Sequence, residues 1–270
     1  MFEWFLGINP VLQALMAGIF TWACTALGAA LVFFVRRMDD KFLAIMQGLA
    51  GGVMTAASFW SLLDPAIEYG ESGPLPAWMP AAIGFLLGGI FLSILDNVIP
   101  HLHASADHGD FDINNSKLGK NTMLFLAVTI HNFPEGMALG VAYAAAAAQP
   151  GLASMSGAIA LTIGIGLQNF PEGSALSLPI LASGKSKKEA FNLGQLSAII
   201  EPIGAVLGAW AVTQITALLP YALSFAAGAM IFVVVEELIP ESQESGFTDS
   251  ATLAFLAGFT LMMVLDVALG

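Results

Sequence analysis

Two closely similar hexapeptides carry the residues of this chain that could do chemistry. His131-Asn132-Phe133-Pro134-Glu135-Gly136 and Gln168-Asn169-Phe170-Pro171-Glu172-Gly173 begin at positions 131 and 168, and each lies within an apolar stretch long enough to cross a bilayer. A carboxylate at the centre of a bilayer costs about 2.5–3.5 kcal/mol on the translocon scale, so it is rare there without a function. Two carboxylates, an imidazole and several carboxamides at similar depth are suitable ligands for a divalent metal ion held inside the membrane.

The spacing within each hexapeptide brings its polar groups onto one helix face. Residues four apart share a face, so His131 stacks on Glu135 and Gln168 on Glu172. The proline of each motif has no N–H, which leaves one main-chain carbonyl near the polar groups without its helical partner. Glu201, before Pro202, supplies a third carboxylate at mid-membrane depth. Histidine and carboxylate ligands together favour zinc and its first-row neighbours, whereas Ca²⁺ and Mg²⁺ prefer oxygen alone.

The elements that position these residues are predicted to be transmembrane helices. The chain is 57% hydrophobic and only 10% charged, and a transmembrane helix needs about 20 mostly apolar residues. We therefore expect an all-α protein with one polytopic domain over residues 1–270, embedded in a lipid bilayer. Eight segments qualify as spans: 10–35, 42–64, 77–99, 121–148, 152–182, 190–214, 219–240 and 249–269.

The basic residues predict how the chain is oriented in the membrane. They fall in three alternate connections between the segments, near 36–41, 117–120 and 185–188. Short cytoplasmic loops are the ones rich in Lys and Arg, so these connections are expected inside and both termini outside. The connection after 240 carries Glu241, Glu244 and Asp249 without a base, but acidic residues weigh little in this rule.

The repeat also predicts symmetry. The two hexapeptides lie on successive segments that cross the membrane in opposite directions, so a two-fold axis in the membrane plane would relate them. Inverted repeats with a binding site at the midplane are typical of secondary transporters.

The two motifs, followed by Glu201-Pro202 and by Glu236-Glu237-Leu238-Ile239-Pro240, resemble those of the ZIP (Zrt-/Irt-like) metal transporters, particularly the bacterial GufA-type branch. The resemblance covers the whole chain. It implies a multi-pass protein of the bacterial inner membrane that carries divalent metals into the cytoplasm. Zn²⁺, and also Cd²⁺, Fe²⁺ and Mn²⁺, would be transported substrates, with no cofactor required.

The resemblance also implies two adjacent metal sites. His131, Glu135, Gln168 and Glu172 match the primary site, with Met54 as an additional candidate ligand. The second site adds Asn132, Asn169 and Glu201, and it shares Glu135 and Glu172 as bridging ligands. Many eukaryotic relatives have histidine at the position of Gln168, so the amide here favours a broader metal range.

Other polar residues have two interpretations each. Glu68 and Asp266 either form an acidic entrance or are ordinary surface residues, and Asp96, Glu236 and Glu237 could line a cytoplasmic exit. The predicted cytoplasmic loop 101–120 is rich in histidine and aspartate. Its His101, His103 and His108 either bind metal or belong to a plain solvated loop.

Two alternatives to a secondary transporter remain at this point. A membrane-embedded metallohydrolase would need an open metal position and a general base, but the chain has no HExxH motif. A passive metal channel would share every ligand.

Four GxxxG-spaced glycine pairs allow close helix packing, either within one chain or in a homodimer. The net charge of −12 does not suggest a nucleic-acid partner, which would require a basic patch.

Overall fold

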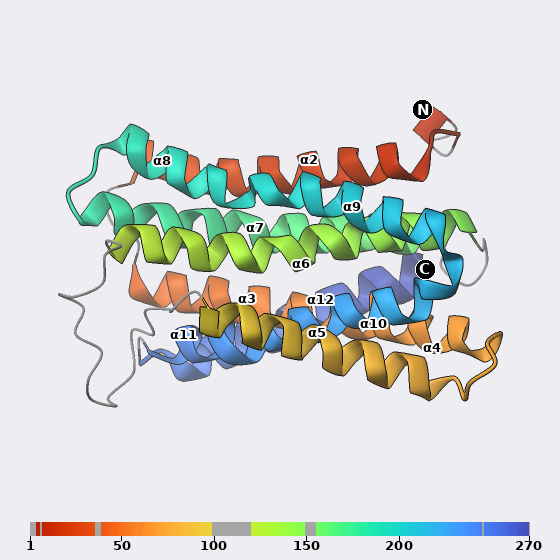
Figure 1. Ribbon diagram of the computed structural model, residues 1–270. Helices are drawn as coiled ribbons and strands as arrows, with labels where there is room; N and C mark the ends of the chain where they lie inside the picture. Colours follow the sequence, from red (N-terminus) through yellow and green to blue (C-terminus); the bar gives the residue numbers. More distant parts are fainter. Residues whose placement is uncertain are drawn as a thin grey trace.

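A computed structural model describes residues 4, 5, 7–35, 39–98, 120–148, 155–244 and 246–269 (Figure 1). In this part of the chain every regular element is a helix, so the predicted all-α class is confirmed. The helical elements are α2 (Pro10–Ala29), η1 (Ala30–Phe33), α3 (Asp40–Ala57), η2 (Ser58–Leu63), α4 (Asp64–Glu71), α5 (Trp78–Val98), α6 (Lys120–Ala148), α7 (Met155–Ala182), α8 (Lys187–Leu196), η4 (Ser197–Ile199), α9 (Ile200–Gln214), η5 (Thr216–Leu218), α10 (Leu219–Val233), η6 (Val234–Leu238), α11 (Ile239–Glu244) and α12 (Thr248–Leu269).

Seven helical stretches among the described residues are long and apolar enough to cross a membrane. They coincide with seven of the eight predicted segments. The remaining segment is α7, whose 28 residues also suffice in length. Its hexapeptide places Gln168, Asn169 and Glu172 in one stretch, which lowers the apolar character of the helix. An eighth crossing by α7 therefore remains a prediction.

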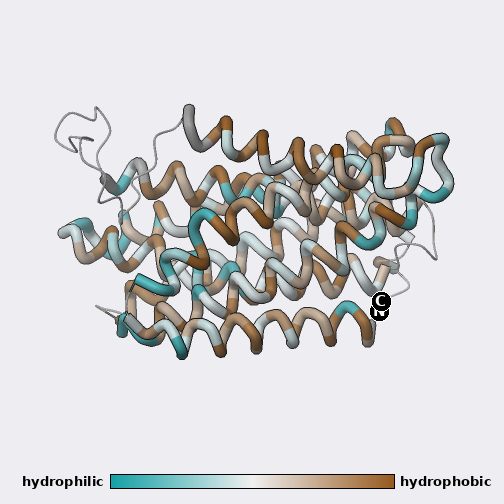
Figure 2. Tube along the Cα trace, turned by 90° about the horizontal axis from the view of Figure 1, so that it is seen from below, coloured by the Kyte–Doolittle hydropathy of each residue, from teal (hydrophilic) through white to brown (hydrophobic). Residues whose placement is uncertain are grey.

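The surface of the bundle suits a lipid environment. Large apolar side chains such as Leu86, Trp210 and Leu253 are exposed on the outward faces of their helices. Figure 2 shows hydrophobic residues along the length of the helices, with hydrophilic residues mostly toward the two ends of the bundle. A surface of this kind is stable only when hydrocarbon covers it.

The helices form two groups that pack side by side (Figure 1). In the first group, α2 packs on α7 and α9, and α6 packs on α9 and α7. In the second group, α3 packs on α12, and α10 packs on α5 and α4. The two groups meet mainly where α3 and α12 contact α7 and where α10 contacts α6. Because α6 and α7 carry the hexapeptides, the motifs lie where the two groups meet.

The start of α2 and the end of α12 lie at the same end of the bundle (Figures 1 and 2). This arrangement agrees with an even number of crossings. The side of the membrane that this end faces remains a prediction.

Two helices extend further than the sequence predicted. The segment ending at 64 continues through η2 and α4 to Glu71, and the segment ending at 240 continues through η6 and α11 to Glu244. Both η2 and η6 are π-helical turns. Pro65 and Pro240 each follow the first residue of the next α-helix, where the missing N–H is harmless. The prediction was therefore wrong about Glu68 and Glu241, which lie inside helices.

The glycine pairs pack within the chain. A β-carbon on Gly136 would collide with the main chain of Glu201. Gly173 is not part of these pairs, but a β-carbon there would likewise collide with the carbonyl oxygen of Thr25. The other pairs also face helices of the same chain, with Gly48 against Ala251, Gly84 against Tyr221 and Gly204 against Phe133. The glycine that ends each hexapeptide thus lets its helix approach α9 or α2 closely. A homodimer remains a prediction.

Candidate metal site

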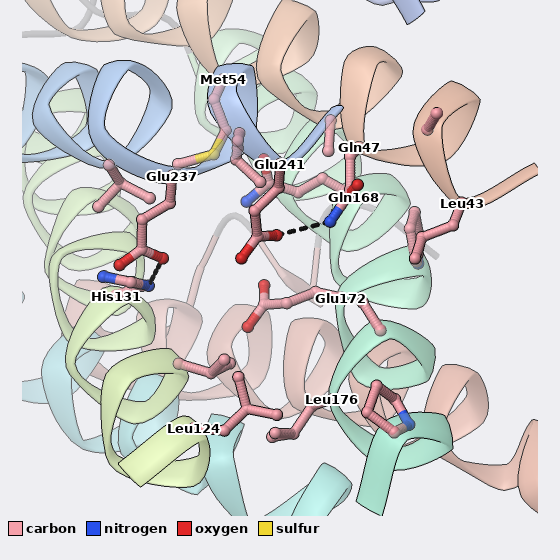
Figure 3. A pocket seen from close by; sticks show the side chains of 18 of the residues that line it. Leu43, Gln47, Met54, Leu124, His131, Gln168, Glu172, Leu176, Glu237 and Glu241 are labelled. Atoms are coloured by element: carbon pink, nitrogen blue, oxygen red, sulfur yellow. Dashed lines mark hydrogen bonds and ion pairs between the residues drawn. The ribbon is translucent and has the colours of Figure 1, made fainter. Parts of the chain in front are cut away.

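A cavity of about 460 Å³ leads from the hexapeptides to one end of the bundle. Its buried part is lined by five residues predicted as metal ligands, namely Met54, His131, Glu135, Gln168 and Glu172. Its other end is lined by Asp40 at the start of α3 and Glu244 at the end of α11, and both of these are exposed. Figure 3 shows the side chains of Glu172, Glu237 and Glu241 pointing into the same space.

Hydrogen bonds within the cavity connect the two hexapeptides to each other and to η6. The Gln168 amide Nε2 donates to Glu135 Oε1 at 2.6 Å, joining α7 to α6. His131 Nδ1 lies 2.9 Å from Glu237 Oε2, joining α6 to η6 (Figure 3). The sequence predicted that His131 and Glu135 share a helix face. The structure places both in the cavity wall but gives each a partner from a different helix.

A second layer of predicted ligands is enclosed behind the cavity. Asn132, Asn169 and Glu201 are fully buried, and none of the three lines the cavity. Asn169 Nδ2 donates to Glu201 Oε1 at 2.8 Å and to the main-chain oxygen of Thr21 at 3.2 Å. The structure thus places the predicted ligands in a cavity-lining set and an enclosed set, and the assignment of two metal sites to them stays a prediction.

Most of the buried polar atoms that lack a hydrogen bond belong to these residues. Nine buried side-chain nitrogen or oxygen atoms in the described residues have no hydrogen-bond partner. Leaving such an atom unpaired costs about 1–3 kcal/mol, so seven at one place need a common cause. A bound cation would satisfy the six oxygens among them. The seven atoms are Asn132 Nδ2 and Oδ1, Glu135 Oε2, Gln168 Oε1, Asn169 Oδ1, Glu172 Oε1 and Glu201 Oε2.

The charge at this place also calls for a cation. Glu135 is repelled electrostatically by Glu172 and Glu201, and Glu172 and Glu201 repel each other. Among the described residues that line the cavity there is no lysine or arginine. Three buried carboxylates without a lysine or arginine partner are strongly unfavourable in their charged form, and a divalent ion would offset that charge.

No three histidine, cysteine, aspartate or glutamate side chains within the described ranges converge closely enough to hold a metal by themselves. The carboxamides of Gln168 and Asn169 each donate a hydrogen bond to one of the carboxylates, Glu135 and Glu201 respectively. A complete ligand set would therefore have to include amide oxygens.

The other predicted residues have different outcomes. Asp266 is buried and accepts a hydrogen bond of 2.6 Å from Ser61 Oγ, and its second oxygen, Oδ2, has no partner. Glu68 is exposed on α4. Of the pair in η6, Glu237 lines the cavity and Glu236 does not. Asp96 belongs to α5, but its side chain lies outside the described part of the structure, as do residues 101, 103 and 108 and their histidines.

Sequence analysis missed several polar residues of the cavity. Glu241 and Glu244 were predicted to lie in a loop, whereas they line the cavity together with Glu237. Gln47 of α3 donates to Glu241 Oε2 at 2.5 Å. The spacing of positions 237, 241 and 244 indicates one helix face. That signal was lost because the helix was ended at Pro240.

The fold and the site define a multi-pass integral membrane protein with a buried cavity that is lined by acidic side chains. The chain belongs to the ZIP zinc transporter family, since the family model described as "ZIP Zinc transporter" matches residues 106–266. Membership assigns this chain to divalent-metal transport and not to an enzyme class.

Relatives match along nearly the whole chain. It is 40% identical to "Zinc transporter GufA" of Myxococcus xanthus over 95% of this chain and 98% of that protein. It is 38% identical to "Zinc transporter ZIP11" of Xenopus tropicalis over 98% of this chain and 99% of that protein. It is also 36% identical to "Zinc transporter ZIPB" of Bordetella bronchiseptica, over 95% of this chain and 81% of that protein.

Proposed function

We propose that this protein is a secondary transporter that carries zinc and related divalent metal ions into the cytoplasm by alternating access. The observation that carries the proposal is the set of buried oxygens without hydrogen bonds. Oxygens of Glu135, Gln168 and Glu172 lie at the closed end of a cavity whose other end is exposed. An ion bound by these oxygens would have a path to one side of the membrane.

The division of the ligands supports a binuclear site. The cavity-lining set would hold an ion with a direct path to the solvent. The enclosed set of Asn132, Asn169 and Glu201 would hold a second ion, with Glu135 and Glu172 bridging the two. Both bridging residues line the cavity, and both interact electrostatically with Glu201.

The positive-inside rule supports the proposed direction of transport. The cavity ends near Asp40 and Pro179, at the end of the bundle that carries Lys41 and Lys185. If these lysines face the cytoplasm, the cavity is the path of release. The carboxylates of Glu237, Glu241 and Glu244 would then attract the leaving ion. Asp266, toward the end of α12, would be a residue of the outer entrance.

The chemistry of the ligands favours a range of metals. One imidazole with carboxylate and amide oxygens suits Zn²⁺ and also Cd²⁺, Fe²⁺ and Mn²⁺. The amide of Gln168 in place of an imidazole weakens the preference for zinc. The relatives carry "zinc transporter" in their names, which makes zinc the first ion to test.

The cavity also favours a carrier over a passive channel. Its lining runs from the buried ligands to one end of the bundle only, whereas a channel needs a path to both ends. The metallohydrolase alternative has no support among the relatives, which are named as transporters.

Uptake by the purified protein in liposomes tests the proposal. A fluorescent indicator inside the vesicles would report the entry of Zn²⁺, Cd²⁺, Fe²⁺ and Mn²⁺ added outside. We expect saturable uptake that is lost in Glu172→Ala and retained in Asp249→Asn, a change at an exposed carboxylate. Absence of uptake by the unmodified protein would refute transport, and uptake that rises linearly with metal concentration would indicate a channel.

A further inference from the structure

A buried tyrosine hydroxyl connects the two helix groups at the end of the bundle opposite the cavity mouth. Tyr69 of α4 is only 4% exposed, and its hydroxyl donates to the main-chain oxygen of Ala145 at 2.8 Å. Tyr69 belongs to the second group and Ala145, in the last turn of α6, to the first. Figure 1 shows α4 at the end of the bundle where α12 also ends.

This hydrogen bond differs from most polar side-chain contacts of the protein in crossing between the groups. The bond from Gln168 to Glu135 and the bond from Asn169 to Glu201 stay within the first group. The bond from Ser61 to Asp266 stays within the second group. A contact inside one group keeps its geometry when the groups move as units, whereas a contact between groups does not.

The acceptor is well suited to a contact that forms and breaks. A main-chain carbonyl oxygen has two lone pairs, so the Ala145 oxygen is able to accept the bond from Tyr69 without disrupting α6. The phenol supplies a rigid donor whose ring is buried against the bundle. Once the groups separate, water at the helix end could replace the hydroxyl as the donor.

We propose that the hydrogen bond from Tyr69 to Ala145 is a latch that holds the bundle closed at one end while the cavity is open at the other. The proposal rests on alternating access, because a transporter of this kind must close one path while the other is open. When the cavity closes and the opposite end opens, this bond breaks. Its loss therefore shifts the population toward the conformation that is open at the Tyr69 end.

Cysteine accessibility can measure that population without any metal. Cys24 is the one cysteine of the chain, so Cys24→Ser gives a background in which a new cysteine is labelled alone. Ala142 is a suitable reporter position because it lies seven residues beyond Glu135, on the same stripe of α6. Ala142 is 6% exposed and does not line the cavity.

The experiment compares rates at which a charged methanethiosulfonate labels Ala142→Cys in detergent-solubilised, metal-free protein. Tyr69→Phe keeps the ring and removes only the hydroxyl. Hydrogen bonds between membrane helices contribute about 0.6 kcal/mol on average and at most about 1.7. These values correspond to an increase in labelling rate of about threefold, with an upper bound near eighteenfold.

Tyr143→Phe is the matched control. Tyr143 is equally buried, and its hydroxyl lies 3.0 Å from Thr162 Oγ1, but α6 and α7 belong to the same group. We expect this variant to label at the rate of the Ala142→Cys background. An unchanged rate in Tyr69→Phe would overturn the latch. Equal increases in both variants would do so as well, because they would indicate general loosening.

The latch and the proposed function fail in distinguishable ways. Faster labelling of Tyr69→Phe in a protein that moves no metal in liposomes would retain the latch and refute transport. Normal, saturable uptake together with unchanged labelling of Tyr69→Phe would retain transport and refute the latch.

Discussion

Replacing Glu135 by glutamine should weaken metal binding strongly while leaving the metal-free protein at least as stable. Glu135 is 2% exposed, its Oε1 accepts a bond of 2.6 Å from Gln168, and its Oε2 has no hydrogen-bond partner. Glutamine has the same shape, and its amide oxygen can keep the bond from Gln168. The substitution therefore removes the charge and preserves the packing, with an amide nitrogen in the place of the unpaired oxygen.

The expected loss of affinity can be bounded. Removing an outer-shell partner of a metal ligand already costs about 10–100-fold in affinity. Loss of a direct carboxylate ligand should cost at least the upper value, about 100-fold or 2.8 kcal/mol. In the metal-free protein the substitution should increase the stability of the fold, because Glu172 and Glu201 no longer repel a third carboxylate. Relief of about 1 kcal/mol would raise Tm by roughly 2–4 °C.

Two measurements on the same purified protein test this expectation. Titration calorimetry with Zn²⁺ gives the Kd, and thermal unfolding in the presence of a chelator gives Tm. Asp249→Asn, which neutralises an exposed carboxylate at the start of α12, should change neither. A Glu135→Gln protein that binds zinc as tightly as the unmodified chain would refute the assignment of Glu135 as a ligand. A large fall in Tm without metal would show a structural role instead.

Four further expectations concern transport and packing. Glu172→Ala should nearly abolish uptake, and a normal rate from protein present in the membrane would contradict a shared bridging ligand. Gln168→His should narrow the metal range toward zinc, which competition of zinc uptake by cadmium, iron and manganese would measure. Uptake should fall as the pH is lowered, because His131 must be neutral to bind metal; steady uptake from pH 7 to 5 would argue against histidine ligation. Gly173→Ala should lower Tm, because its methyl group would meet the main-chain oxygen of Thr25, whereas an unchanged Tm would mean that α2 and α7 separate easily.

The membrane helices and the candidate site residues of this protein could be predicted from local features of its sequence. Long apolar segments predict membrane helices because hydrocarbon excludes unpaired main-chain groups. A carboxylate in such a segment is costly enough that its presence indicates a function. The residues of the two hexapeptides could therefore be named without a structure, and five predicted ligands do line one cavity. Membership of the ZIP family was also visible in these motifs.

The ends of two helices could not be predicted in the same way. Pro65 and Pro240 are typical helix stops, but here each follows the first residue of a helix that continues from a π-helical turn. Whether a proline ends a helix or begins its next part depends on the turn before it, and packing against neighbouring helices decides that turn. Glu241 was therefore assigned to a loop, although it lines the cavity.

Only the tertiary structure decided which helices meet. Periodicity places His131 and Glu135 on one face of α6, but it says nothing of what that face contacts. The structure pairs Glu135 with Gln168 and His131 with Glu237, and it separates an enclosed layer from the cavity wall. The cavity and the bond from Tyr69 to Ala145 likewise arise from residues far apart in sequence. Such contacts depend on which helices pack closely together, for example at glycines such as Gly136. No local pattern specifies the packing partner, because a glycine fits equally well against any helix that approaches it.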